Sequence, residues 1–287
     1  MSEQVPSVYE HVPREQYHLL ADFRQRYPYQ KFKSGSLSWS YIRAGEGQET
    51  VLLLPTGLVS LDLWLHLLPE LARHYRVLAL ASHTETFALS AVNQAITDLL
   101  HHEGAERVTA IGVSYGGGVG QAYLQTAPNR LKNLVLSHCT PVTMRTAKRL
   151  ERGARLVKWI PNRPLRFILS RRRTRYPARS QWQTLTAAYF QEQALVSHKA
   201  TVMKFMLDGV ANARAFTFDA EVVNKWSGNL LLLTSADDAT SYPHFEALKR
   251  RYPQAETNIF PEGGHHTLLI FPHKYGQAVL NFCAQSM

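Results

Sequence analysis

Hydrophobic and polar positions divide most of the chain into short apolar runs separated by segments with helical character. The apolar runs are typical of strands buried in a sheet, and they fall at 50–55, 76–81, 108–113, 131–139, 229–236 and 255–261. Helices are predicted around and between them, at 14–26, 63–75, 90–104, 118–128, 242–252 and 273–285. Residues 36–44 alternate as in an antiparallel strand. Strands that alternate with helices predict a mostly parallel sheet covered on both faces.

One internal segment, residues 141–227, interrupts this alternation. It is helical in pattern and rich in arginine, and it contains no convincing strand. We therefore expect a core built from 1–140 and 228–287, with 141–227 inserted as a helical cap, or lid, over one end of the sheet. The net charge of +10 is concentrated there, since this segment carries 17 Lys and Arg against 5 Asp and Glu.

The basic residues of the insertion have several interpretations. Arg145, Arg149 and Arg152 fall on one helical face, and a second arginine cluster lies in 167–182. One interpretation is a solvated outer face of the cap. Another is attraction of an anionic or acyl substrate, such as an acyl-CoA, a carrier-protein thioester or a phospholipid.

A third interpretation of the basic segment is peripheral contact with an anionic membrane. Lysine and arginine are mixed there with Trp159, Ile160, Phe167 and Ile168, a combination that binds lipid interfaces. Nucleic acid is not expected as a partner, because the aromatic residues do not form a stacking platform and the rest of the chain is near neutral.

The glycine-rich stretch 108–120, VTAIGVSYGGGVG, places a serine between a predicted strand and a predicted helix. Gly112 to Gly116 match the pattern G-x-S-x-G, in which small residues let a strained turn expose the hydroxyl of Ser114 above the sheet. A phosphate-binding loop is excluded by the missing Lys-Ser or Lys-Thr and by glycine spacing that does not fit a dinucleotide site.

A serine nucleophile needs a base, and the base needs an orienting acid. In chain order, Asp237 and Asp238 follow the predicted strand at 229–236, and His265 and His266 follow the last strand. These positions, after a later strand and after the last strand, are those that the mechanism requires for the acid and the base. The spacing by itself leaves the choice within each pair open.

With these motifs in this order, the chain resembles the α/β-hydrolase superfamily. The resemblance implies an α/β-hydrolase fold with a mostly parallel sheet and an inserted cap. The family's G-x-x-D spacing implies that Asp238 is the acid, with Asp237 as the alternative, and its Gly-His pair implies that His265 is the base. The resemblance leaves His266 as a loop side chain.

The oxyanion hole is expected to use two backbone N–H groups. One belongs to Tyr115, directly after the serine. The other is implied by the resemblance at Gly57, in a Pro-Thr-Gly loop that departs from the His-Gly pair of many members and is similar to the loop of some lactonases. A glycine there is expected to leave its N–H unobstructed.

The leading prediction is a serine hydrolase that cleaves a carboxylic ester, lactone or thioester. The alternative comes from FRQRYPYQKF, LPTGLVSLDLW and KRRYPQAETNIFPEGG, which resemble maspardin-type members and imply a non-catalytic binding or adaptor protein. Hydrolysis of a C–C bond and acyl transfer are further variants. No cofactor or metal is expected, because the two cysteines lack a ligand spacing. The absence of a signal or membrane-spanning pattern predicts a cytoplasmic protein.

Overall fold

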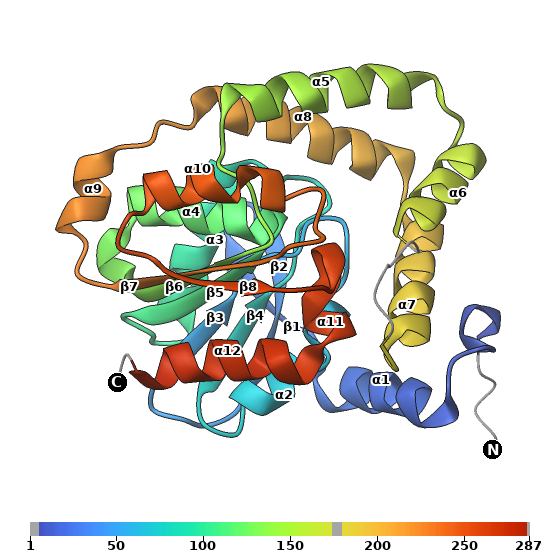
Figure 1. Cartoon of the computed structure of the whole chain (residues 1–287), viewed down its shortest axis with the longest axis horizontal. Helices are drawn as coiled ribbons and strands as arrows, with labels where there is room; N and C mark the ends of the chain where they lie inside the picture. The colour runs from blue at the N-terminus through green and yellow to red at the C-terminus, as the bar shows by residue number, and fades with distance from the viewer. Residues whose placement is uncertain (1–5, 174–179, 286–287) are drawn as a thin grey trace.

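The computed structural model describes residues 6–173 and 180–285. Within them, eight strands form one sheet in the order β1-β2-β4-β3-β5-β6-β7-β8 (Figure 1). Strands β1 and β2 run antiparallel to their neighbours, and the strands from β4 to β8 are parallel. The strands are Gln30–Ser34, Leu37–Ala44, Thr50–Leu53, Arg76–Leu80, Val108–Val113, Leu131–Ser137, Asn229–Ser235 and Glu256–Phe260.

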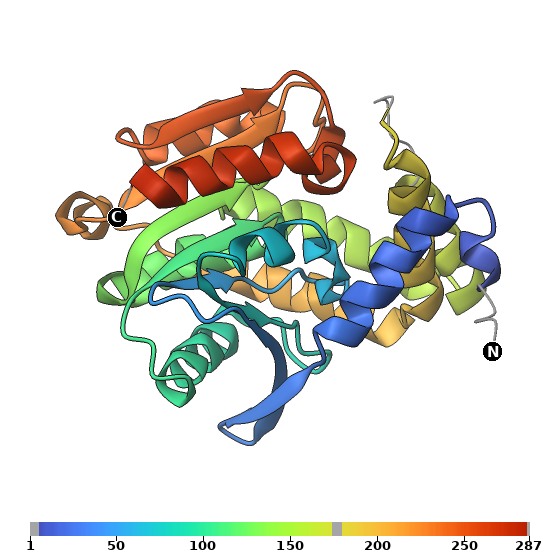
Figure 2. The ribbon, with the colours of Figure 1, turned by 90° about the horizontal axis from the view of Figure 1, so that it is seen from below.

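Helices cover both faces of this sheet, as the two ribbon views show (Figures 1 and 2). Helices α3, α4 and α10 pack on one face, and α1, α2 and α12 pack on the other. The helices α1 to α12 are Arg14–Arg26, Leu67–Leu71, Leu89–His102, Tyr115–Thr126, Met144–Trp159, Asn162–Arg173, Gln183–Val196, Lys199–Ala215, Ala220–Lys225, Phe245–Arg251, Thr267–Ile270 and Pro272–Gln285.

The central strands are apolar on both sides because each side contributes to a separate core. In and just after β3, Leu52 and Leu54 join the core beneath α3 and α4, whereas Val51 and Leu53 join the core beneath α2 and α12. All four side chains are at most 1% exposed. This burial on two faces explains why the sequence has continuous apolar runs there.

The segment between β6 and β7 contains helices α5 to α9 and, in its described part, no strand. Helix α5 runs beside α8 along one side of the core, and α6 and α7 turn down toward α1 (Figures 1 and 2). Ala147 of α5 packs against Val210 and Ala213 of α8 in a small core of their own. The described part of 141–227 is thus helical, and the arginine cluster predicted at 167–182 lies partly outside the described residues.

The structure differs from the predicted elements in three places. In place of the single helix predicted at 63–75, the chain forms a short 3₁₀ helix at Leu61–Trp64 and the short α2. Helix α4 begins at Tyr115, three residues before the predicted start, because Gly116 and Gly117 are required by close packing against Pro55 and Cys139 and not by a loop. Strand β1 was not predicted; as an exposed edge strand of sequence QKFKS it lacks an apolar run.

Candidate functional site

The turn between β5 and α4 holds Ser114 in a strained conformation, with φ of 54° and ψ of −108°. Glycines make this turn possible. A Cβ added to Gly112 would lie 2.3 Å from the carbonyl oxygen of Gly116, and one added to Gly116 would lie 2.8 Å from that of Pro55. The backbone of the turn is therefore pressed against its neighbours, and Ser114 projects from the carboxyl edge of the sheet.

Three predicted side chains meet at this edge in a continuous hydrogen-bonded chain. Ser114 Oγ lies 2.9 Å from His265 Nε2, and His265 Nδ1 lies 2.8 Å from Asp238 Oδ2. Each residue comes from the loop that follows a different parallel strand, β5, β8 and β7 respectively. This is the arrangement in which a histidine takes the serine proton while a carboxylate orients the ring.

Asp238 is held as a carboxylate by its hydrogen-bond donors. Only 2% of the residue is exposed, and burial alone would raise its pKa. Hydrogen bonding and charge from His265 oppose that effect, as do the Ser241 hydroxyl and the Thr240 N–H. The net result is a pKa well below the ordinary aspartate value, so Asp238 stays ionised beside the imidazole.

The neighbouring Asp237 has a different set of contacts. Its two carboxylate oxygens accept the N–H groups of Gly263, at 3.2 Å, and Gly264, at 2.8 Å. These glycines directly precede His265, so Asp237 holds the loop that carries the histidine. His266 also points elsewhere: its ring packs 4.1 Å, between centroids, from that of Phe190 on α7.

A buried histidine behind the site was not identified from the sequence. His138, at the end of β6, is fully buried and has a positive φ of 46°. Its ring nitrogens lie 2.8 Å from Ser137 Oγ and 3.0 Å from Thr267 Oγ1, and Thr267 donates to the Gly264 carbonyl. In the sequence His138 lies within the apolar run 131–139, where nothing distinguishes a buried histidine. His138 supports the loop of His265 from beneath.

The His138→Asn variant is expected to flatten the dependence of stability on pH. Burial, followed by the charge of His265, lowers the pKa of His138 to about 3, so the folded protein keeps it neutral. An unfolded histidine titrates near about 6.5. The contribution of neutral His138 to the free energy of unfolding is therefore complete above about pH 6.5. It declines by up to about 1.4 kcal/mol per pH unit as the pH falls toward 3.

Urea unfolding at about pH 7 and pH 5 measures this effect. Asparagine tolerates a positive φ and still forms hydrogen bonds, which limits other damage. The exposed His244→Asn is the control. An unchanged difference between the two pH values in His138→Asn would contradict a neutral buried imidazole.

The predicted oxyanion donors have different surroundings. Tyr115 is the first residue of α4, where an N–H has no acceptor within its own helix. Gly57, with φ of 77°, lies against Tyr115, since a Cβ there would be 3.2 Å from the Tyr115 Cβ. The expectation of an unobstructed Gly57 N–H was wrong, because this group donates to Ser82 Oγ at 2.8 Å. A substrate carbonyl at Gly57 has to share the N–H with Ser82 or displace it.

Two hollows open from Ser114 and His265, and Phe205 and Tyr115 also line both. The first, which we term the cap arm, has a volume of about 210 Å³ and runs beneath the cap, where it is lined by Pro141, Val142, Thr146, Leu150, Gly209, Asn212 and Ala213. The second, the loop arm, has about 270 Å³ and is lined by Thr56, Leu58, Val59, Leu63, Phe190 and His266.

Among the described residues that line these two arms, none is a lysine, arginine, aspartate or glutamate. The basic side chains of the cap that the structure describes therefore do not line the space around the serine. A larger hollow of about 460 Å³, next to Gly57 and Ser82, includes neither Ser114 nor His265. In the described part of the chain, no group of three or more His, Cys, Asp or Glu is arranged to hold a metal ion.

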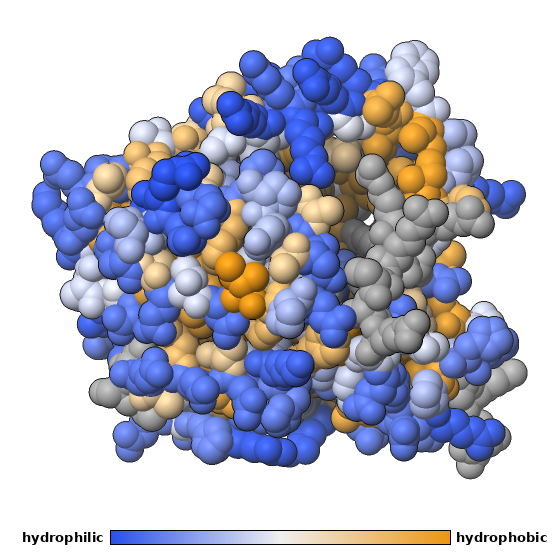
Figure 3. All heavy atoms as spheres, in the orientation of Figure 1, coloured by the Kyte–Doolittle hydropathy of each residue, from blue (hydrophilic) through white to orange (hydrophobic). Residues whose placement is uncertain are grey.

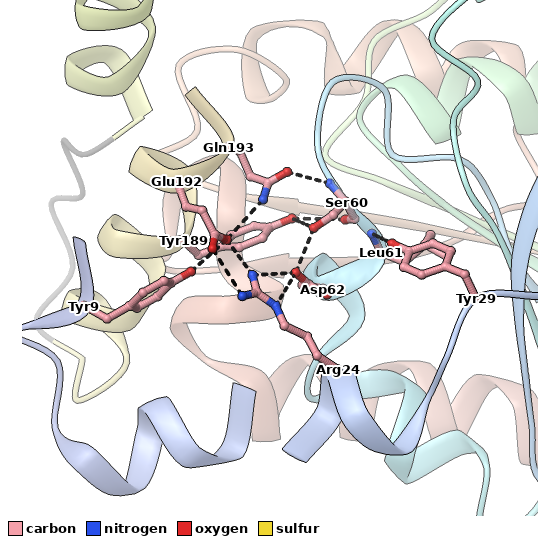
Figure 4. Close-up of polar contacts among 9 residues, drawn as sticks. All are labelled: Tyr9, Arg24, Tyr29, Ser60, Leu61, Asp62, Tyr189, Glu192 and Gln193. Atoms are coloured by element: carbon pink, nitrogen blue, oxygen red, sulfur yellow. Dashed lines mark hydrogen bonds and ion pairs between the residues drawn. The ribbon is translucent and has the colours of Figure 1, made fainter. Parts of the chain in front are cut away.

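The loop that carries Gly57 is fixed by an ionic cluster that the sequence did not predict (Figure 4). Arg24 of α1 donates to Asp62 of this loop at 2.8 Å and to Glu192 of α7 at 2.5 Å. Around this arginine, Gln193 accepts the Ser60 N–H at 2.9 Å. Three tyrosines make further hydrogen bonds: Tyr9 with Glu192, Tyr29 with Leu61, and Tyr189 with Ser60. Arg24 thereby connects the N-terminal helix, the loop after β3 and the cap.

Replacing Arg24 by methionine is expected to lower both stability and turnover. The change leaves Asp62 and Glu192 without their shared cation, which costs about 1–2 kcal/mol for such partly exposed groups. A displaced loop misaligns Gly57, so we expect kcat to fall about tenfold. Urea unfolding and ester-hydrolysis kinetics measure the two effects.

Arg43→Met is the matched control for this variant. Arg43 is similarly exposed, at 34% against 36%, and also contacts two glutamates, Glu46 and Glu103, but it lies on β2. The two variants are expected to lose similar stability, with a loss of turnover only in Arg24→Met. Equal kcat values in the two variants would contradict a role in loop positioning.

The sheet is mostly parallel, and a serine lies on the turn between one of its strands and a helix. This serine is hydrogen-bonded to a histidine, which is hydrogen-bonded to a buried aspartate. Together these features define a class of α/β proteins with a Ser-His-Asp site. The sequence model of the alpha/beta hydrolase family matches residues 51–280, and the chain belongs to that family. No curated protein matches the sequence.

Solved structures share the fold at low identity. An esterase from Thermogutta terrifontis has a TM-score of 0.75 at 19% identity, over 90% of this chain and 99% of that one. The enol-lactonase of Burkholderia xenovorans LB400 has a TM-score of 0.74 at 14%, over 90% and 100%. The 2-hydroxy-6-oxo-6-phenylhexa-2,4-dienoate hydrolase of Rhodococcus sp. strain RHA1 has 0.69 at 17%, over 90% and 99%.

Proposed function

We propose that this protein is a serine hydrolase that cleaves a carboxylic ester, lactone or thioester through an acyl-enzyme on Ser114. The observation that carries the proposal is the hydrogen-bonded chain from Ser114 through His265 to Asp238. Two further features support it. One is the strained conformation of Ser114, and the other is that Ser114 and His265 line both arms of the cavity.

In the proposed mechanism, His265 Nε2 takes the proton of Ser114 as Oγ attacks the substrate carbonyl carbon. The ionised Asp238 accepts from Nδ1, which leaves Nε2 free to act as the base and stabilises the imidazolium that forms. The tetrahedral oxyanion is bound by the N–H groups of Tyr115 and Gly57. His265 then protonates the leaving group, and a water that it activates releases the acyl group.

The two arms of the cavity support a substrate with a group on either side of the scissile bond. The cap arm is the more apolar of the two, with Pro141, Val142 and Leu150 in its wall, and we assign the acyl chain to it. The loop arm contains Thr56 and His266, whose polar atoms suit an alcohol or thiol leaving group. A neutral lining favours an uncharged moiety at the serine, even where the whole substrate is anionic.

Three alternatives remain in the proposal. A non-catalytic binding or adaptor function is favoured by the Ser82 hydroxyl, which occupies the N–H of Gly57. Hydrolysis of a C–C bond is favoured by the structural similarity to the Rhodococcus dienoate hydrolase, and acyl transfer uses the same chemistry with an alcohol in place of water.

A substrate panel distinguishes these possibilities. p-Nitrophenyl esters of increasing chain length, aliphatic lactones, acyl thioesters and a vinylogous 1,5-diketone are offered to the protein, with release of product followed over time. We expect ester or thioester cleavage with an initial burst that reports the acyl-enzyme. Cleavage of the diketone alone would favour the C–C variant, and no turnover of any class by folded protein would favour the binding function.

A further inference from the structure

The outer face of α5 combines arginines with exposed apolar side chains. Arg145, Arg149, Arg152, Leu156 and Trp159 recur at spacings of four, three, four and three residues, which places them along one side of the helix. All five are exposed; Leu156 is 69% exposed and Trp159 82%. We call these five residues the α5 stripe.

The α5 stripe has no part in packing the cap. The buried residues of the same helix, Ala147, Ala154 and Val157, face the opposite direction and contact α8 and its surroundings. The stripe also contributes nothing to the two arms of the cavity, which no described arginine lines. Its charge and its apolar side chains are therefore presented to the exterior.

The positive charge of the stripe is not neutralised within the protein. Glu151 is the only acidic residue of 144–173, and it pairs with Arg155 and Arg214 instead. In the part of the chain that the structure describes, no ion pair is formed by Arg145, Arg149 or Arg152. Fixed positive charge on an exposed helix face attracts an anionic partner.

The apolar part of the stripe continues around the corner from α5 into α6. Ile168 is 41% exposed and Phe167 58%, and the exposed Arg163 lies one helical turn before Phe167. Lys199, at the start of α8, donates to the Lys158 carbonyl at 2.7 Å and so joins the same corner. In Figure 3, hydrophobic atoms lie beside strongly hydrophilic ones over this end of the cap.

We infer that the α5 stripe docks the protein on the surface of a membrane containing anionic lipid headgroups. The arginines of the α5 stripe bind lipid phosphates, and Trp159 and Leu156 enter the boundary between headgroups and acyl chains. The contact is peripheral, since no helix among the described residues is long and apolar enough to cross a bilayer.

The composition of the stripe favours a lipid surface over other occupants. A second copy of the chain would bring two unneutralised arginine rows together, which repel. An acidic protein would pair with the arginines but would leave the apolar side chains of the stripe without a partner. Trp159, which is 82% exposed, is of the residue type that prefers the membrane interface. Residues 145–159 extend about 21 Å along the axis of α5, a length that suits a helix lying flat on a bilayer.

Flotation with vesicles tests this inference independently of catalysis. The full-length Ser114→Ala protein, which retains the whole cap, is mixed with vesicles of phosphatidylcholine alone or of phosphatidylcholine with about one quarter phosphatidylglycerol. We expect at least about tenfold more protein to float with the anionic vesicles, and we expect this excess to fall severalfold as salt rises from about 0.05 to 0.5 M.

Two stripe variants and two matched controls locate the contact. Leu156→Ser combined with Trp159→Ala, and Arg149→Glu combined with Arg152→Glu, are each expected to reduce flotation at least about tenfold. Lys31→Glu with Lys33→Glu makes the same charge change on the exposed edge strand β1, and Tyr242→Ala removes an aromatic that is 44% exposed. Both controls are expected to float almost as the parent does.

Three results would overturn the inference. The first is no flotation of the folded parent with anionic vesicles. The second is equal loss in the stripe variants and the controls, because the bound surface would then lie elsewhere. The third is binding of soluble polyglutamate, or self-association in light scattering, without vesicle binding; these results assign the stripe to an acidic protein or to a second copy.

Discussion

The Ser114→Ala variant is expected to lose ester hydrolysis by about 10⁴-fold or more in kcat, with KM little changed. Removing Oγ deletes the atom that attacks the carbonyl, whereas the Cβ and the backbone of the turn stay as they are. Binding in the cap and loop arms does not depend on Oγ, so the substrate still occupies the site. Steady-state kinetics with the best ester of the substrate panel measures the loss.

A control shows that the loss belongs to this serine. Ser36→Ala changes an exposed serine in the turn between β1 and β2 and is expected to leave kcat unchanged. Circular dichroism and urea unfolding of both variants establish that the fold is intact. Retention of more than about a tenth of the wild-type kcat by Ser114→Ala would contradict a serine nucleophile, since losses at such positions are far larger.

The second large effect is expected for Asp238→Asn, at about 10⁴-fold in kcat. Asparagine is nearly isosteric, but its amide donates to His265 Nδ1. The imidazole proton is then held on Nε2, which can no longer accept the proton of Ser114. Because Asp238 is buried and firmly ionised in the wild type, the loss is expected at every pH at which the protein is folded.

Asp237→Asn is the matched control, because it makes the same chemical change in the adjacent residue. Asp237 accepts the N–H groups of Gly263 and Gly264, and an asparagine side chain still accepts one of them. We expect less than about a tenfold decrease in kcat, from a looser histidine loop. The reverse ranking of the two variants would make Asp237 the acid and contradict the geometry of the site.

The sequence predicted the fold well because its strongest signals are physical consequences of that fold. Strand β5 at Val108–Val113 was predicted to the residue, since a strand buried on both faces has to be apolar throughout. The glycines of the serine turn were informative for a similar reason, because no side chain fits at Gly112 or Gly116. The membership of the α/β-hydrolase family and the mostly parallel sheet are confirmed.

Features that depend on the meeting of distant segments were not predictable. Arg24, Asp62 and Glu192 are separated by 38 and 130 positions, and no local pattern marks an arginine that bridges two carboxylates. The bond from the Gly57 N–H to Ser82 depends on how two loops lie beside each other. The supporting role of His138 depends on contacts with Ser137 and Thr267 that no local pattern marks.

The central claim is that Ser114 is an activated nucleophile, and labelling with a fluorophosphonate tests it most directly. Intact-mass spectrometry of the folded wild type is expected to show one adduct per chain, which peptide mapping places on Ser114, and no adduct on Ser114→Ala. A folded wild-type protein that stays unlabelled, or an equal adduct on Ser114→Ala, would contradict the account.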